Sequence, residues 1–168
     1  MARPPLDWSG KLPANLAELG FSRESKLRID AEGRLLHEGE LVEHAAMARA
    51  MMGWLTRHPD DGRWVLENGW DWCYLAVDDV PWVARNARVE GEALIVSLAD
   101  GTEEPLADLH ADRSGGVRGS VKASARGGPH PAKLSRTAQL SLVDRLVEHD
   151  GGIALALEGR VVPLLPRY

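Results

Sequence analysis

The alternation of hydrophobic and polar residues in the first half of the chain is typical of two β-hairpins. Residues 27–30 and 34–37 predict strands on either side of a tight turn, in which Gly33 supplies the positive φ that such a turn requires. Residues 63–67 and 72–77 predict a second pair of strands, because the first of these runs is rich in the aromatic and β-branched residues that suit a pleated surface.

A helical pattern separates the two predicted hairpins. Apolar residues recur at helical spacing between residues 41 and 57, at Met47, Met51, Trp54 and Leu55. We therefore expect a helix here, with Met51 and Trp54 buried on its apolar face.

The second half of the chain follows the same order. Strands are predicted at residues 83–89, 93–98 and 117–125. Ser135 is a predicted N-cap for a helix that continues to about His149. A hairpin at residues 153–164 closes the chain, and its Glu158-Gly159-Arg160 turn repeats the Glu32-Gly33-Arg34 turn of the first hairpin.

This recurrence predicts an α+β fold built from a repeated unit of strands, helix and strands. We expect two twisted, mainly antiparallel sheets, each packed with one helix. The predicted divisions are an N-terminal arm at residues 1–25, a first unit at 26–82 and a second unit at 83–168. Each unit is too small to bury its helix alone, so we expect the two to pack as one body.

Composition favours an ordinary globular protein. Hydrophobic residues make up 44% of the chain, charged residues make up 27%, and the formal net charge is -5. The single cysteine excludes an internal disulfide, and no segment has the apolar length of a membrane span or the pattern of a signal peptide. These features predict a cytoplasmic protein that does not enter a membrane.

Three segments resemble an uncharacterised bacterial family, domain of unknown function 1285. They are Arg28-Ile29-Asp30-Ala31-Glu32-Gly33 with His37-Glu38-Gly39, Val77-Asp78-Asp79-Val80-Pro81-Trp82, and Ala132-Lys133-Leu134-Ser135-Arg136. The similarity covers roughly residues 26–164. Asp78 stands where the family has Glu, Trp82 where it has Phe, and Leu35 where it has an aromatic residue. The resemblance implies a repeated-motif α+β fold and a role in signalling or regulation, with no assigned activity.

Candidate catalytic residues form no recognised motif. Cys73 lies inside a predicted strand, where a free cysteine is more often a small buried hydrophobe than a nucleophile. His37, His110 and the Asp78-Asp79 pair have residue types suited to a hydrolase or a metal-dependent enzyme, but their spacing matches no known site. We predict no catalytic residues, no metal and no cofactor, and keep this enzyme as an alternative.

Tryptophan is concentrated in the middle of the chain, where five of the six residues fall between Trp54 and Trp82. These rings supply either core or an aromatic cleft, since large aromatic side chains bury much area and are also common at binding sites. The candidate ligand-binding residues are His37, Trp70, Trp72, Asp79, Trp82 and Arg85.

Residues 113–136 are basic within an acidic protein. They contain six Lys and Arg residues and no carboxylate. The candidate anion-binding residues are Arg118, Lys122 and Arg126. The alternative is that this row pairs with the preceding acidic residues Glu103, Glu104, Asp108 and Asp112.

The function favoured by these observations is that of a non-enzymatic binding or regulatory protein. Its partner is expected to be a protein or a small molecule of unidentified kind. Nucleic acid is a weaker expectation, resting on the basic segment alone, and the oligomeric state is left open.

Overall fold

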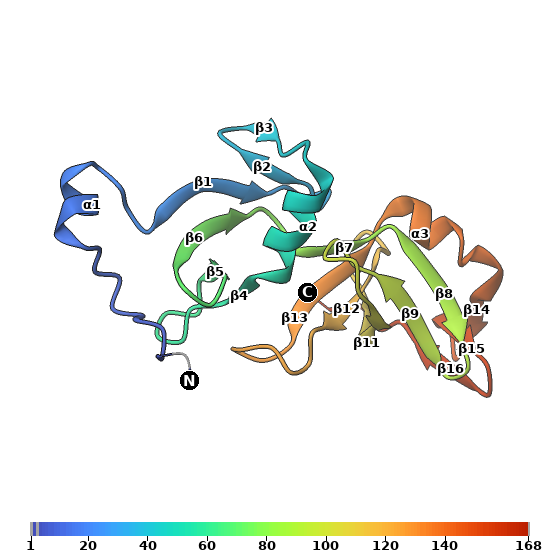
Figure 1. The fold of residues 1–168 in the computed structure, drawn as a ribbon. Helices are drawn as coiled ribbons and strands as arrows, with labels where there is room; N and C mark the ends of the chain where they lie inside the picture. Colours follow the sequence, from blue (N-terminus) through green and yellow to red (C-terminus); the bar gives the residue numbers. More distant parts are fainter. Residues whose placement is uncertain (1, 3, 168) are drawn as a thin grey trace. The chain divides into compact units, whose positions relative to one another are not determined.

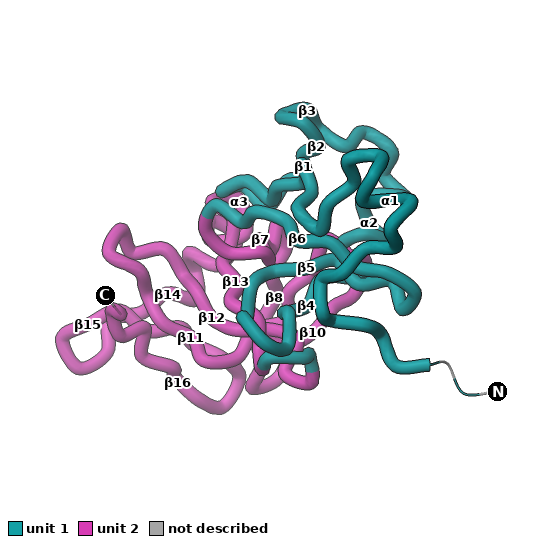
Figure 2. The backbone as a smooth tube through the Cα atoms, turned by 90° about the vertical axis from the view of Figure 1, so that its left-hand side faces the viewer, with its two compact units in different colours: residues 1–78, 125–127 teal, residues 79–124, 128–168 magenta. Residues whose placement is uncertain are grey.

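The structure is a computed structural model that describes residue 2 and residues 4–167. The chain divides into two compact units, coloured separately in Figure 2. Unit 1 comprises residues up to Asp78 together with Ala125–Gly127, and unit 2 comprises Asp79–Ser124 and Gly128 onward.

Unit 1 is built on one six-stranded sheet (Figure 1), in the order β3-β2-β1-β6-β5-β4. The strands are β1 (Glu24–Ile29), β2 (Leu35–His37), β3 (Glu40–Leu41), β4 (Leu55–Arg57), β5 (Trp64–Glu67) and β6 (Trp72–Val77). β1 and β6 run parallel, and every other neighbouring pair is antiparallel. The helices are α1 (Ala14–Glu18) and α2 (Ala45–Gly53). Ile29 in β1 and Val65 in β5 are fully buried.

The first hairpin turns at the predicted position. Gly33 has a φ of 78°, and the Asp30 carboxylate accepts hydrogen bonds from the Arg34 backbone N–H at 2.8 Å and from Arg34 Nε at 2.7 Å. Burial of Asp30 opposes its ionisation, but the hydrogen bonds from Arg34 outweigh this effect and lower the pKa of the carboxyl. The buried Asp30 thus holds the turn closed.

The helix of unit 1 is shorter than its apolar pattern indicates, and the prediction for its buried face is wrong. α2 begins after His44, whose Nδ1 accepts from the Met47 backbone N–H at 3.2 Å, and it ends at Gly53. Met51 is only half-buried, Trp54 lies beyond the helix and is 39% exposed, and Met52 is the buried residue of the helix, at 2% exposed. Because the helix stops before Trp54, its ring does not continue the helical face.

Unit 2 contains three smaller sheets. Their orders are β10-β9-β8, β11-β12-β13-β7 and β14-β15-β16. The strands are β7 (Trp82–Ala84), β8 (Asn86–Glu90), β9 (Ala93–Ser97), β10 (Glu103–Pro105), β11 (Ala107–Ala111), β12 (Val117–Val121), β13 (His130–Leu134), β14 (Leu146–His149), β15 (Gly152–Leu157) and β16 (Arg160–Pro163). β13 and β7 run parallel. Trp82, Leu94 and Leu155 are among the buried residues of this unit.

The predicted N-cap of the last helix is confirmed, but the predicted length of that helix is wrong. Ser135 Oγ accepts from the Ala138 backbone N–H at 3.1 Å, and α3 covers only Arg136–Leu140. A short 3-10 turn, Val143–Arg145, follows it, and Leu146–His149 forms β14. The apolar pattern of this stretch suits a strand as well as a helix, and antiparallel pairing with β15 selects the strand.

The α+β class is confirmed, with four sheets among the described residues where two were expected. Residues 103–111 and 130–134, which carry no strong strand pattern, pair with β9, β12 and β7 in two of the sheets. The strands β14, β15 and β16 form a separate sheet. No helix in the described part of the chain is long and apolar enough to cross a membrane.

Candidate functional site

Unit 1 has a groove between α2 and the β1-β2-β3 side of its sheet. The groove has a volume of about 470 Å³. It is lined by Ser25, Leu27, His37, Glu40, Leu41, Val42, Met47 and Met51, and we call it the α2 groove. A volume of this size, with an apolar lining and a few polar groups, is typical of small-molecule sites.

The apolar wall of the α2 groove is accessible from solvent. Leu41 in β3 is 53% exposed, and Met47 in α2 is 54% exposed. Methionine side chains are flexible and polarizable, so they adapt to ligands of different shape. His37 is the one candidate ligand-binding residue that lines this groove, and Glu40, which was not a candidate, lines it as well. Glu40 is exposed.

A smaller cavity of about 170 Å³ adjoins the α2 groove, since Leu27 and Met51 line both. Trp54 and Cys73 line this second cavity. Burial raises the pKa of the Cys73 thiol, which keeps it protonated and poorly nucleophilic. The position of Cys73 therefore favours a cavity wall over a nucleophile.

The candidate tryptophans of unit 1 occupy different environments. Trp72 is 4% exposed, and its Nε1 donates to the Asp7 backbone carbonyl at 2.8 Å. Its ring packs edge-on against His58 and Tyr74, with centroids 4.8 and 5.1 Å away. Trp70, by contrast, is 74% exposed. The two side chains differ in burial because Trp70 lies in the hairpin turn, whereas Trp72 begins β6.

Trp82 belongs to the core of unit 2. It is 1% exposed, its Nε1 donates to His130 Nδ1 at 3.1 Å, and the two rings are stacked at 6.4 Å. The Lys122 ammonium group lies 5.1 Å from the Trp82 ring centroid. Arg85, which follows β7, is exposed. Trp82 thus lines no open surface in this unit.

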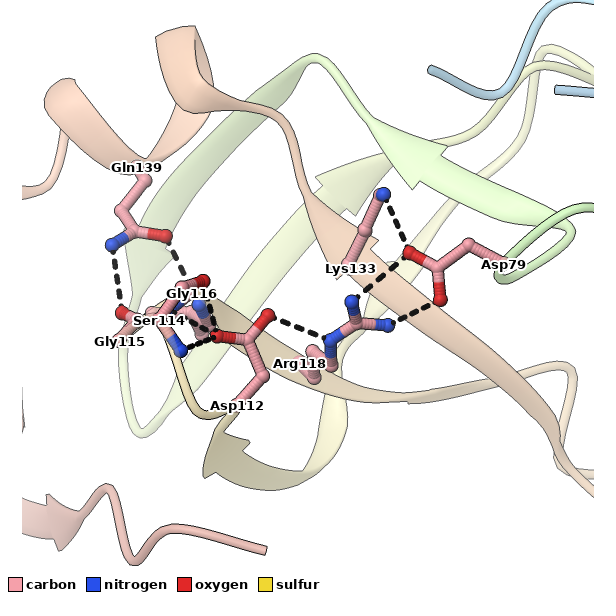
Figure 3. Close-up of polar contacts among 9 residues, drawn as sticks. Asp79, Asp112, Ser114, Gly115, Gly116, Arg118, Lys133 and Gln139 are labelled. Atoms are coloured by element: carbon pink, nitrogen blue, oxygen red, sulfur yellow. Dashed lines mark hydrogen bonds and ion pairs between the residues drawn. The ribbon is translucent and has the colours of Figure 1, made fainter. Parts of the chain in front are cut away.

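Asp79 is part of a charge network within unit 2 (Figure 3). Its carboxylate accepts two hydrogen bonds from Arg118, at 2.9 and 3.0 Å, and one from Lys133 Nζ at 2.7 Å. Arg118 Nε donates in turn to Asp112 at 2.9 Å. The hydrogen bonds from Arg118 lower the pKa of Asp79. An external anion would have to displace one of these carboxylates to reach Arg118.

The other two residues of the basic segment lie in different surroundings. Lys122 has a φ of 56° just beyond β12, and its Nζ donates to Asp100 at 2.6 Å and to Thr102 at 2.8 Å. Arg126 belongs to unit 1, where its guanidinium group lies 4.6 Å from the Trp8 ring centroid. The three candidate anion-binding side chains therefore do not share one strand face.

The residues of the enzyme alternative are divided between the two units. His37 and Asp78 belong to unit 1, whereas His110 and Asp79 belong to unit 2. His110 Nδ1 lies 2.8 Å from the Asp108 backbone oxygen. Within residue 2 and residues 4–167, no group of three or more His, Cys, Asp or Glu side chains is placed to hold a metal ion.

Sequence reasoning missed most of the α2 groove. The sequence pattern assigned Leu41 and Met47 to a helix and its apolar face, and not to a binding site. A second missed feature is Trp8, which lies far from the other tryptophans in the sequence but contacts Trp72 at 5.3 Å between ring centroids.

No protein-family model matches the chain, and no curated protein matches it in sequence. Two solved structures are similar in fold. A DUF1285 family protein from Silicibacter pomeroyi DSS-3 is 22% identical, with a TM-score of 0.62 over 84% of this chain and 80% of that one. A DUF1285 family protein from Shewanella baltica OS155 is 18% identical, with a TM-score of 0.58 over 73% of this chain and 94% of that one. The chain therefore has the fold of the DUF1285 proteins.

Proposed function

We propose that this chain is a non-enzymatic, cytoplasmic binding protein of the DUF1285 family with a regulatory role, and that its α2 groove takes a small, largely apolar ligand. The observation that carries the proposal is the groove itself, about 470 Å³ in volume and walled by Leu27, Leu41, Met47 and Met51. Family membership is supported by the shared fold and by the three sequence segments that resemble the family.

The polar groups of the groove favour a neutral or positively charged ligand. Glu40 brings a carboxylate to the groove, and the His37 ring offers nitrogen atoms that can hydrogen-bond to a ligand. An anionic ligand would be repelled by Glu40. A regulatory role agrees with a binding site whose flexible methionine walls respond to occupancy.

The test is a titration with the neutral fluorophore 1-N-phenylnaphthylamine, whose emission rises in apolar surroundings. Leu41→Ser and Met47→Ser should each weaken binding roughly fivefold to tenfold, because each removes about 1 to 1.5 kcal/mol of apolar contact. Both residues are more than half exposed, so neither change should unfold the protein.

Ile153→Ser is the matched control, since Ile153 is 62% exposed in unit 2 and lies outside the groove. It should bind the fluorophore like the parent protein. Equal affinities for all four proteins, or a loss confined to the control, would contradict the proposal. Glu40→Gln should in addition raise the affinity for the anionic probe 8-anilinonaphthalene-1-sulfonate.

A further inference from the structure

A short segment that precedes β1 is held on unit 1 through its main chain. Trp72 Nε1 donates to the Asp7 carbonyl oxygen at 2.8 Å, and His58 Nε2 lies 3.1 Å from the Trp8 carbonyl oxygen. We call residues 7–11 the docked arm. Because both contacts go to carbonyl oxygens, they would be available to any peptide chain that follows the same path.

The hydrogen-bonding roles of these contacts follow from their neighbours. His58 Nδ1 accepts from the Asp60 backbone N–H at 3.2 Å, so its Nε2 carries the proton and donates to Trp8. At the other end of the docked arm, Arg23 Nη2 donates to the Lys11 carbonyl oxygen at 3.4 Å. Unit 1 therefore presents three donors to successive parts of the arm.

The Trp8 side chain is enclosed by groups from three separate segments. Its ring meets the His58 ring edge-on at 5.2 Å and the Trp72 ring at 5.3 Å, and the Arg126 guanidinium group lies 4.6 Å from its centroid. A tryptophan anchored among aromatic and arginine side chains is the typical arrangement of an energetic hot spot in a protein interface.

The chain that links the docked arm to the sheet is only loosely packed. None of residues 4–23 is fully buried. The short helix α1, which lies within this stretch (Figure 1), has no buried residue. Leu19 and Phe21 are 73% and 62% exposed. Release of the arm would therefore uncover the rings of Trp72 and His58 without removing any fully buried residue.

We propose that the surface formed by His58, Trp72, Arg23 and Arg126 is a peptide-binding site that the chain's own arm occupies. Its external partner is a peptide segment that follows the same bent path, places a tryptophan where Trp8 lies and offers carbonyl oxygens to the same donors. The arm acts as an intramolecular competitor, whose short tether gives it an effective concentration in the millimolar range. This site is separate from the α2 groove and does not depend on it.

The test uses the full chain and a fluorescently labelled peptide with the sequence of residues 4–12. Trp8→Ala removes the anchor of the internal arm, so the variant should bind the peptide at least about tenfold more tightly than the parent chain. A peptide in which the tryptophan is replaced by alanine should not bind. Fluorescence anisotropy measures all four combinations, and circular dichroism checks that the variant is folded.

Gly10→Pro provides a second way to release the arm. Gly10 has a φ of 78°, which proline cannot adopt, and nothing lies within 4 Å of a side chain built there. This variant should bind the peptide as Trp8→Ala does. Trp70→Ala is the matched control, because Trp70 is 74% exposed in the same unit, and it should bind the peptide like the parent chain.

Three results would overturn the proposal. The first is that neither folded variant binds the peptide more tightly than the parent. The second is that the peptide without its tryptophan binds as well as the original. The third is that the variants bind no peptide while the parent forms a concentration-dependent dimer, which would assign the surface to the arm of a second copy.

Discussion

The carboxylates of Asp78 and Asp79 are adjacent in the chain but are bound within different units. Asp78 accepts from Arg28 Nη1 at 2.6 Å in unit 1, whereas Asp79 accepts from Arg118 and Lys133 in unit 2. The chain passes from one unit to the other between these two residues. Both carboxylates are thus engaged by cations, which does not favour their use as a paired general acid and base.

Asp79→Asn should destabilise unit 2 by roughly 1 to 3 kcal/mol, because it leaves Arg118 and Lys133 without their shared carboxylate. Asp78→Asn is the matched control and should cost less than about 1 kcal/mol, since Arg28 is 55% exposed and its ion pair is screened by water. Urea unfolding midpoints of the two variants decide the matter. Equal midpoints would show that the network in Figure 3 contributes no more than a surface ion pair.

The pH dependence of stability should involve Asp112 as well as Asp79. Hydrogen bonds from Ser114 lower the pKa of Asp112, with a further contribution from Arg118. The pKa of Asp79 is also lowered, chiefly by its hydrogen bonds from Arg118. A carboxyl whose pKa is lower in the folded state stabilises the protein at pH values above its unfolded-state pKa of about 3.9. This stabilisation is lost as the pH falls toward the folded-state pKa. Urea midpoints measured between pH 7 and pH 3 should fall for the parent and fall less for Asp112→Asn.

Gly119→Ala should be strongly destabilising. A Cβ at this position in β12 would clash with the Ala107 backbone oxygen of β11 and would lie 2.8 Å from Leu106 Cγ. Separating these strands to relieve the clash should cost about 1 to 3 kcal/mol or more. Gly53→Ala is the matched control, because nothing lies within 4 Å of a Cβ at the end of α2. It should be neutral or slightly stabilising, by up to about 1 kcal/mol, in the same thermal unfolding experiment.

Two tryptophans should respond differently to truncation. Trp82→Ala removes a ring that is 1% exposed and should cost roughly 3 to 5 kcal/mol. Trp54→Ala removes a ring that is 39% exposed and borders the smaller cavity, so its cost should be well below that of Trp82→Ala. Denaturant titrations of both variants provide the comparison. A larger loss for Trp54→Ala would mean that its ring is more important to packing than its exposure indicates.

Local features of the fold could be predicted from the sequence because their partners lie within a few residues. The Asp30–Arg34 turn, the Ser135 N-cap and the strands of β5 and β6 depend on neighbouring residues and on alternation along one segment. The same local pattern could not distinguish strand from helix at Leu146–His149, since that choice depends on pairing with β15.

The candidate sites depended on distant parts of the chain. Leu41 and Met47 border a groove only because the fold brings β3 and α2 together with residues of β1 and β2. Trp8 meets Trp72 across more than sixty residues of chain, and the Trp72 Nε1 hydrogen bond to Asp7 spans a separation of 65. The sequence by itself determined the α+β class, the turns and the main strands, since short-range geometry and alternation specify them. Only the tertiary structure decided which cations Asp78 and Asp79 bind and which tryptophans are buried, because those partners are brought together by long-range strand pairing.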